Sequence, residues 1–167
     1  MLEQHRTLRE GVVAGALAAT AVAIWFLLLD SVAGRPLATP SMLGASLSSL
    51  FGMPGTPTPA AAIVGYTFFH YAAFAVAGLI GATVMNNAEE EPSVLIGFFI
   101  LFIAFEIGWY GLSAILARSE FFGQLAWYQV FVANLIAAGT IGTYLFRRHP
   151  GLASRFAHSL AGDEAEA

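Results

Sequence analysis

Long apolar runs with almost no ionisable side chain constrain this chain more than any other feature of its sequence. Four such runs follow one another, at about 11–29, 60–85, 93–117 and 121–146. A helix needs about 20 residues to cross the roughly 30 Å hydrocarbon core of a bilayer, and each run reaches or approaches this length. Because no water in the bilayer can bond free backbone groups, these runs are predicted to be helices. The sequence therefore predicts an all-α membrane protein with a bundle of four transmembrane helices.

The scarcity of charge excludes several other classes of protein. Only 11% of the 167 residues are charged and 57% are apolar, whereas soluble domains are about a quarter charged. A net charge of -4 does not favour binding to nucleic acid. The absence of cysteine removes disulfides, thiolate metal sites and cysteine nucleophiles. The lipid bilayer is therefore the first expected partner, and nucleic acid is not expected as one.

Arginines set the predicted orientation, because the chain has no lysine. With the N-terminus in the cytoplasm, five arginines lie inside: Arg6, Arg9, Arg147, Arg148 and Arg155. Arg35 and Arg118 then lie outside, which is the positive-inside pattern. The sequence predicts one transmembrane domain over 1–150, a short cytoplasmic tail over 151–167, and both termini inside.

A second interpretation of the N-terminal segment stays open. Arginines, an apolar stretch and Ser31-Val32-Ala33 before Gly34 could together form a cleaved secretory signal. Against it, the apolar stretch is longer than the usual length of about 7–15 residues, and Asp30 lies beside the presumed site. Cleavage would leave three helices.

The connection at 31–59 is expected to contain one short helix. Five prolines bar regular structure across much of it, but Thr39-Pro40 is typical of a helix start. Apolar residues then recur at helical spacing opposite serines: Leu43, Leu47, Leu50 and Phe51 opposite Ser41, Ser48 and Ser49. The pattern indicates an amphipathic helix on the outer membrane surface, with a plug over the bundle ends as the alternative. Asp30 and Arg35 are interpreted as a solvated pair.

Local signals also predict where helices begin and end. Thr58-Pro59 places a capping hydroxyl and a first-turn proline at the start of the second run. Basic residues followed by Pro150-Gly151 predict the end of the fourth run.

Small residues recur every four positions on three of the predicted helices. They are Gly11, Gly15, Ala19 and Ala23 on the first, Ala73, Ala77 and Gly81 on the second, and Ala138 and Gly142 on the fourth. Helices in lipid associate through close packing, which small residues permit. The stripes predict contacts within the bundle, or with a second copy or another membrane protein.

Two ionisable side chains, His70 and Glu106, interrupt the apolar runs. At 1.5 Å per residue they lie roughly 16 and 18 Å from the outer ends of their helices, so they could meet near mid-membrane. Helical spacing adds neighbours, which gives a candidate cluster of Tyr66, His70, Glu106, Tyr110, Ser113 and Asn134. Such groups mark functional sites by default, and the alternative is that they only fix helix register.

The polar residues supply no catalytic set, so no enzymatic activity, cofactor or metal is expected. A bis-histidine haem needs two deep imidazoles and the chain offers only His70. A metal site needs several converging ligands, and Ser113 near Glu106 lacks an orienting histidine.

Four stretches together resemble a group of small bacterial inner-membrane proteins whose function is unknown. They are GVVAGALAATAVAIWFLLLDSVAGRPLATPSMLGASL, GYTFFHYAAFAVAGLIGA, FEIGWYGLSAIL and LAWYQVFVANLIAAGTIGTYLFRRHP. The resemblance implies the bacterial inner membrane and the same order of four helices. It carries no activity, ligand or catalytic residue with it.

We expect a structural or accessory protein that packs against partners or against itself. The alternative is a small carrier or proton-coupled transport element that uses His70 and Glu106. A transporter should show a water-reachable cavity ending at Glu106, whereas an accessory protein should show a dry, filled core with an exposed patch on one helix face. A membrane enzyme should show several ionisable groups converging on a pocket.

Overall fold

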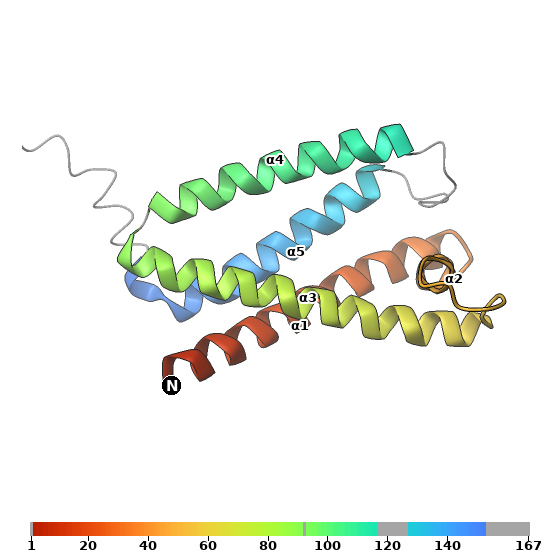
Figure 1. Cartoon of the computed structure of the whole chain (residues 1–167), viewed down its shortest axis with the longest axis horizontal. Coiled ribbons are helices and arrows are strands. Elements are labelled where there is room, and N and C mark those ends of the chain that lie inside the picture. The colour runs from red at the N-terminus through yellow and green to blue at the C-terminus, as the bar shows by residue number, and fades with distance from the viewer. Residues whose placement is uncertain (1, 92, 117–126, 153–167) are drawn as a thin grey trace, which may run out of the picture.

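The computed structural model describes residues 2–91, 93–116 and 127–152 (Figure 1). In chain order the helices are α1 (Leu2–Val32), α2 (Ala38–Leu50), α3 (Pro59–Glu90), α4 (Ser93–Leu116) and α5 (Trp127–Arg148). These residues contain no strand. The prediction of an all-α chain is confirmed.

Within the described residues, three helices are long and apolar enough to cross a membrane. They are Gln4–Val32 in α1, Pro59–Glu90 and Trp127–Arg148. The chain is therefore a membrane protein. The third predicted span, 93–117, falls on α4, where the stretch Ser93–Ile103 is apolar. The predicted start of the fourth span, at 121, and most of the predicted tail lie outside the described residues.

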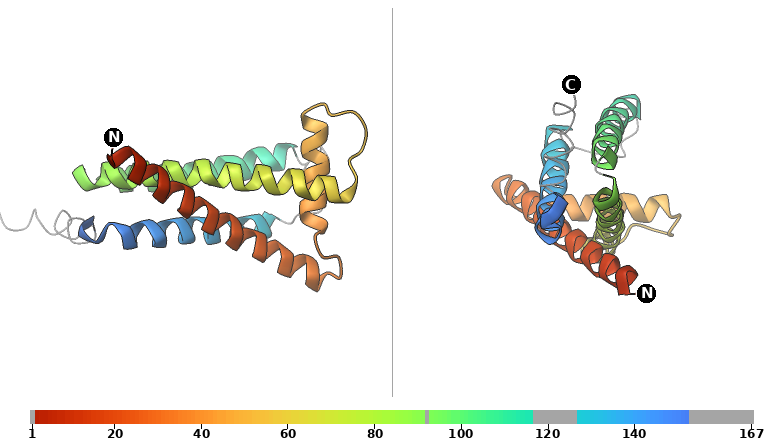
Figure 2. Two further views of the ribbon diagram at one scale, coloured as in Figure 1. Left: turned by 90° about the horizontal axis from the view of Figure 1, so that it is seen from below. Right: turned by 90° about the vertical axis from the view of Figure 1, so that its left-hand side faces the viewer.

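The long helices lie side by side, and α1 crosses α3 obliquely (Figures 1 and 2). α3 lies centrally and contacts each of the other four helices, while α5 contacts α1 and α3. α1 and α4 lie on opposite sides of α3 (Figure 2). α2 runs across the end of the bundle where α1 ends and α3 begins.

The local signals for helix ends give the observed boundaries. Thr58 is the N-cap of α3, and its hydroxyl accepts a hydrogen bond from the amide of Ala61 at 3.3 Å. Pro59 occupies the first turn, where its missing N–H costs nothing. α5 ends at Arg148, as the basic residues before Pro150 predict.

Glycines bring the backbones of α1 and α3 into direct contact. A Cβ added to Gly11 would lie 2.6 Å from the Cα of Leu79, and one added to Gly15 would overlap the carbonyl of Phe74. A Cβ on Gly78 would overlap the carbonyl of Gly11 in the same way. Gly11, Gly15 and Ala19 of the α1 stripe therefore pack within the chain, whereas Ala23 is exposed. On α3, by contrast, Ala73 and Ala77 are exposed and Gly78 makes the contact.

The short helix predicted in the 31–59 connection is present as α2, and Asp30 holds its first turn. The Asp30 carboxylate accepts hydrogen bonds from the amide of Thr39 at 2.7 Å and from its hydroxyl at 2.8 Å. Asp30 is buried, so its interpretation as a solvated partner of Arg35 is wrong. The carboxylate instead satisfies a backbone N–H that has no partner within the helix.

Candidate functional site

His70 lies on the face of α3 that packs against α1, and both of its ring nitrogens have partners. Nε2 lies 3.0 Å from the backbone carbonyl of Ala19, and Nδ1 lies 3.4 Å from the hydroxyl of Tyr66. Because a carbonyl only accepts, Nε2 must carry the proton and donate it. In the neutral ring, Nδ1 is then the acceptor and the Tyr66 hydroxyl donates to it.

Glu106 lies on α4 and is 8% exposed. Its Oε1 accepts a hydrogen bond from the side-chain amide of Asn134 on α5 at 2.8 Å. Its Oε2 is buried and has no hydrogen-bond partner among the residues that the structure describes. A buried carboxyl oxygen without a partner is unfavourable, so this group is held in place at a cost in stability.

The structure gives the members of the predicted polar cluster different partners. Tyr66 pairs with His70, and Asn134 pairs with Glu106. Among the described side chains, His70 and Glu106 share no hydrogen bond or ion pair. The side chains of Tyr110 and Ser113 lie outside the described part of the structure.

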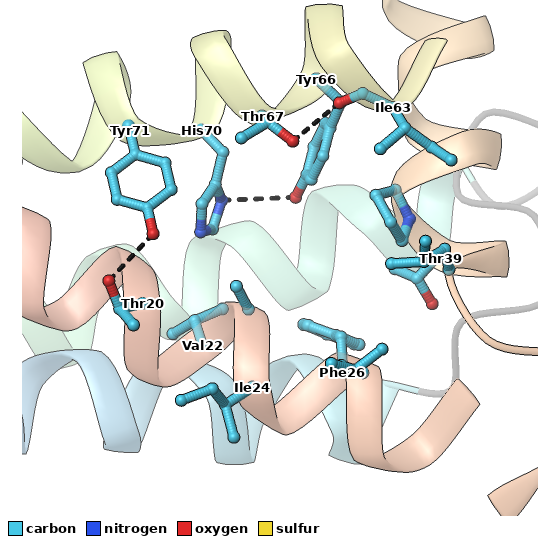
Figure 3. Close-up of a pocket in the computed structure, with 14 residues that line it drawn as sticks. Thr20, Val22, Ile24, Phe26, Thr39, Ile63, Tyr66, Thr67, His70 and Tyr71 are labelled. Atoms are coloured by element: carbon cyan, nitrogen blue, oxygen red, sulfur yellow. Dashed lines mark hydrogen bonds between the residues drawn. The ribbon is translucent and has the colours of Figure 1, made fainter. Parts of the chain in front are cut away.

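A cavity of about 200 Å³ lies beside His70, between α1, α2 and α3 (Figure 3). Its walls are mostly apolar side chains, among them Val22, Ile24 and Phe26 of α1. His70 and Tyr66 contribute polar atoms, and α2 contributes Thr39 at the other end of the cavity. Glu106 does not line it.

A second polar cluster joins three helices at the opposite end of the bundle, and the sequence reasoning missed it. His149, which is 2% exposed, follows α5. Its Nδ1 bonds Oε1 of Glu89 on α3 at 2.5 Å, and its Nε2 bonds Oε2 of Glu10 on α1 at 3.2 Å. Arg6 donates to the other oxygen of Glu10 at 3.1 Å.

The chemistry of this Glu10–Glu89–His149 cluster follows from its hydrogen bonds. With both carboxylates ionised, each can only accept, and both nitrogens of His149 would then donate. In the described part of the chain, no three His, Asp or Glu side chains are arranged to hold a metal ion. The arrangement ties α1, α3 and α5 together. The only signal for it in the sequence is that all three residues fall at the predicted cytoplasmic ends of their helices.

Double-mutant cycles test the two pairings. We expect Glu106→Leu and Asn134→Leu to be non-additive, with a coupling of about 0.6 kcal/mol and at most about 1.7 kcal/mol, the range for hydrogen bonds between membrane helices. His70→Leu and Glu106→Leu should be additive within about 0.5 kcal/mol, because they have no common partner. The measurement is the free energy of unfolding in mixed micelles. A larger coupling for the His70–Glu106 cycle than for the Glu106–Asn134 cycle would contradict the observed partners.

Comparison with known proteins gives no match to a family model, to a curated protein or to a solved structure.

Proposed function

We propose that this chain is a four-span protein of the bacterial inner membrane with both termini in the cytoplasm, and that its role is structural or accessory rather than enzymatic. α4 has 24 residues, which at 1.5 Å per residue make it about 36 Å long, enough to cross the hydrocarbon core. The arginine distribution supports the orientation. The resemblance to small bacterial membrane proteins supports the location.

The exposure of apolar side chains on α4 is the observation that supports a packing role. Six consecutive residues, 96–101, are all exposed, and a helix completes a turn in 3.6 residues. Every side of α4 is therefore at least partly exposed over this stretch, from Phe98 at 37% to Phe99 at 63% and Leu101 at 66%. In lipid, a helix gains stability by packing against another helix. We propose that a partner helix, from a second copy or another membrane protein, packs on this part of α4.

Photo-crosslinking at two phenylalanines tests this role. Phe99 on α4 is 63% exposed and Phe68 on α3 is 80% exposed, so a photoreactive phenylalanine analogue fits at either position. In native membranes we expect one discrete protein adduct from position 99, and only lipid adducts from position 68. Differently tagged copies of the chain then distinguish a second copy from another protein. Lipid adducts alone at both positions would contradict the proposal.

Topology is tested with single cysteines, since the chain contains none of its own. A membrane-impermeant maleimide should label Met53→Cys and Ser119→Cys in intact cells, and His5→Cys and Asn87→Cys only after lysis. If α4 does not cross the membrane, the thiol at 119 will be unlabelled in intact cells. If the first helix is a cleaved signal, the thiol at 5 will be missing from the mature chain.

A second candidate, a proton-coupled carrier, is favoured by one observation. The Oε2 of Glu106, buried and without a partner in the described part of the chain, is a group that could bind and release a proton. The described cavity does not include Glu106, which is why this role ranks second. In liposomes, a carrier should move protons with its substrate, and Glu106→Gln should abolish that movement while Asn134→Asp preserves part of it.

A further inference from the structure

The cavity between α1, α2 and α3 has a chemistry that the proposed packing role does not use. We infer that it binds a neutral membrane-soluble alcohol, a molecule with one hydroxyl group on an apolar chain or ring. Its volume is about 200 Å³, and an apolar cavity of about 150 Å³ is large enough to hold benzene. The cavity therefore accommodates a ring or a short length of chain.

The preference for a hydroxyl group follows from the tautomer of His70. Nε2 of His70 donates its proton to the carbonyl of Ala19, so the ring offers a ligand only the lone pair of Nδ1 as an acceptor. The hydrogen bond from Tyr66 to Nδ1 is long, at 3.4 Å, and such a bond is weak. A ligand hydroxyl can donate to Nδ1 and accept from Tyr66 at the same time, whereas a carboxylate can only accept. The pair therefore selects an alcohol over the ionised form of the corresponding acid.

The route into the cavity runs from the bilayer. Ile24, Leu27 and Tyr71 line the cavity and are also exposed on the lateral surface of α1 and α3. In a membrane this surface faces lipid chains, so a ligand enters from the apolar phase and its remaining chain can stay there.

The wall formed at the start of α2 is strained. Leu37 lines the cavity with φ 68°, in the left-handed region that non-glycine residues avoid. Such a conformation is unfavourable and persists only where the surroundings enforce it, often at ligand sites. Here the hydrogen bonds from Thr39 to Asp30 hold the segment in place.

This inference is independent of the proposed packing role. The cavity lies between α1 and α3, whereas the proposed partner packs on α4, on the opposite side of α3 (Figure 2). Either proposal can therefore fail without the other.

Photolabelling in nanodiscs tests the inference. The probes are a 16-carbon alcohol with a diazirine near its hydroxyl group, and the matched 16-carbon acid. With the full chain in phosphatidylcholine nanodiscs, we expect the alcohol to label the segment Ile63–Tyr71 saturably. Unlabelled hexadecanol should compete for this labelling. At a pH high enough to ionise it in the bilayer, the acid should label the segment about tenfold less, because it loses a hydrogen bond worth about 1.4 kcal/mol.

A pair of matched substitutions locates the site. Ala23 lines the cavity, whereas Ala77 is exposed on α3 and is not among the lining residues. Ala23→Trp should fill the cavity and abolish saturable labelling, and Ala77→Trp should leave it unchanged. Labelling that does not saturate, equal labelling by the acid, or saturable labelling that survives in Ala23→Trp would each overturn the inference. If Ala23→Trp does not fold, competition by hexadecanol on the unmodified chain still decides the result.

Discussion

Replacing Gly15 or Gly78 with leucine should prevent α1 and α3 from forming their native contact, and the chain should lose most of its folded stability. A Cβ at either position overlaps backbone atoms of the facing helix. Backbone cannot move aside as a flexible side chain can, so the helices must separate along their length. Overpacking a core costs about 1–3 kcal/mol and sometimes more, and we expect at least about 3 kcal/mol for each variant.

A glycine elsewhere on α3 provides a matched control. A Cβ added to Gly65 meets no atom within 4 Å. Gly65→Leu, on the same helix as Gly78 and outside the α4 surface proposed for a partner, should therefore leave stability within about 0.5 kcal/mol of the original, as substitutions away from packed contacts usually do. The measurement is the helical signal during titration with sodium dodecyl sulfate. Equal midpoints for Gly65→Leu and Gly78→Leu would show that the α1–α3 contact does not hold the bundle together.

Short-range features of this fold could be predicted from the sequence because neighbouring residues determine them. The start of α3 depends on Thr58 and Pro59, which act on the backbone within one turn. The stripe that begins at Gly11 and Gly15 marks a close helix contact, because only small residues permit it. The stripe does not indicate which residues of the facing helix it contacts, so the contact with Gly78 could be identified only in the structure.

The polar contacts were less predictable, since their partners depend on how the helices are rotated and shifted against one another. His70 bonds the backbone carbonyl of Ala19, a group that every residue carries and that leaves no signal in a sequence. Glu106 was expected near His70 because their depths agree, but His70 faces α1 while α4 lies on the other side of α3, and Glu106 bonds Asn134 (Figure 2). Depth along a helix can be estimated from residue number, whereas rotation about its axis cannot.

The Glu10–Glu89–His149 cluster leads to the second large prediction. His149→Leu should destabilise the chain by about 2–4 kcal/mol, because the buried Glu10 carboxylate loses one of its two described partners and keeps only Arg6. The side chain of Glu10 is 6% exposed and that of Glu89 is 45% exposed. Most of the stability lost in His149→Leu therefore comes from the broken contact with Glu10. Glu89→Gln should therefore cost less than about 1 kcal/mol. His5→Leu makes the same change at an exposed position and should have little effect.

The decisive variant removes both buried partners of this ion pair. A buried pair can be replaced by apolar residues at little cost, since the desolvation of both charges disappears with their attraction. Glu10→Leu combined with His149→Leu should therefore be more stable than His149→Leu alone, by about 1–3 kcal/mol at neutral pH. Unfolding titrations of the four chains in this cycle measure the difference directly. If the double variant instead loses the sum of the two single losses, the two side chains act independently and do not lock α1 to the end of α5.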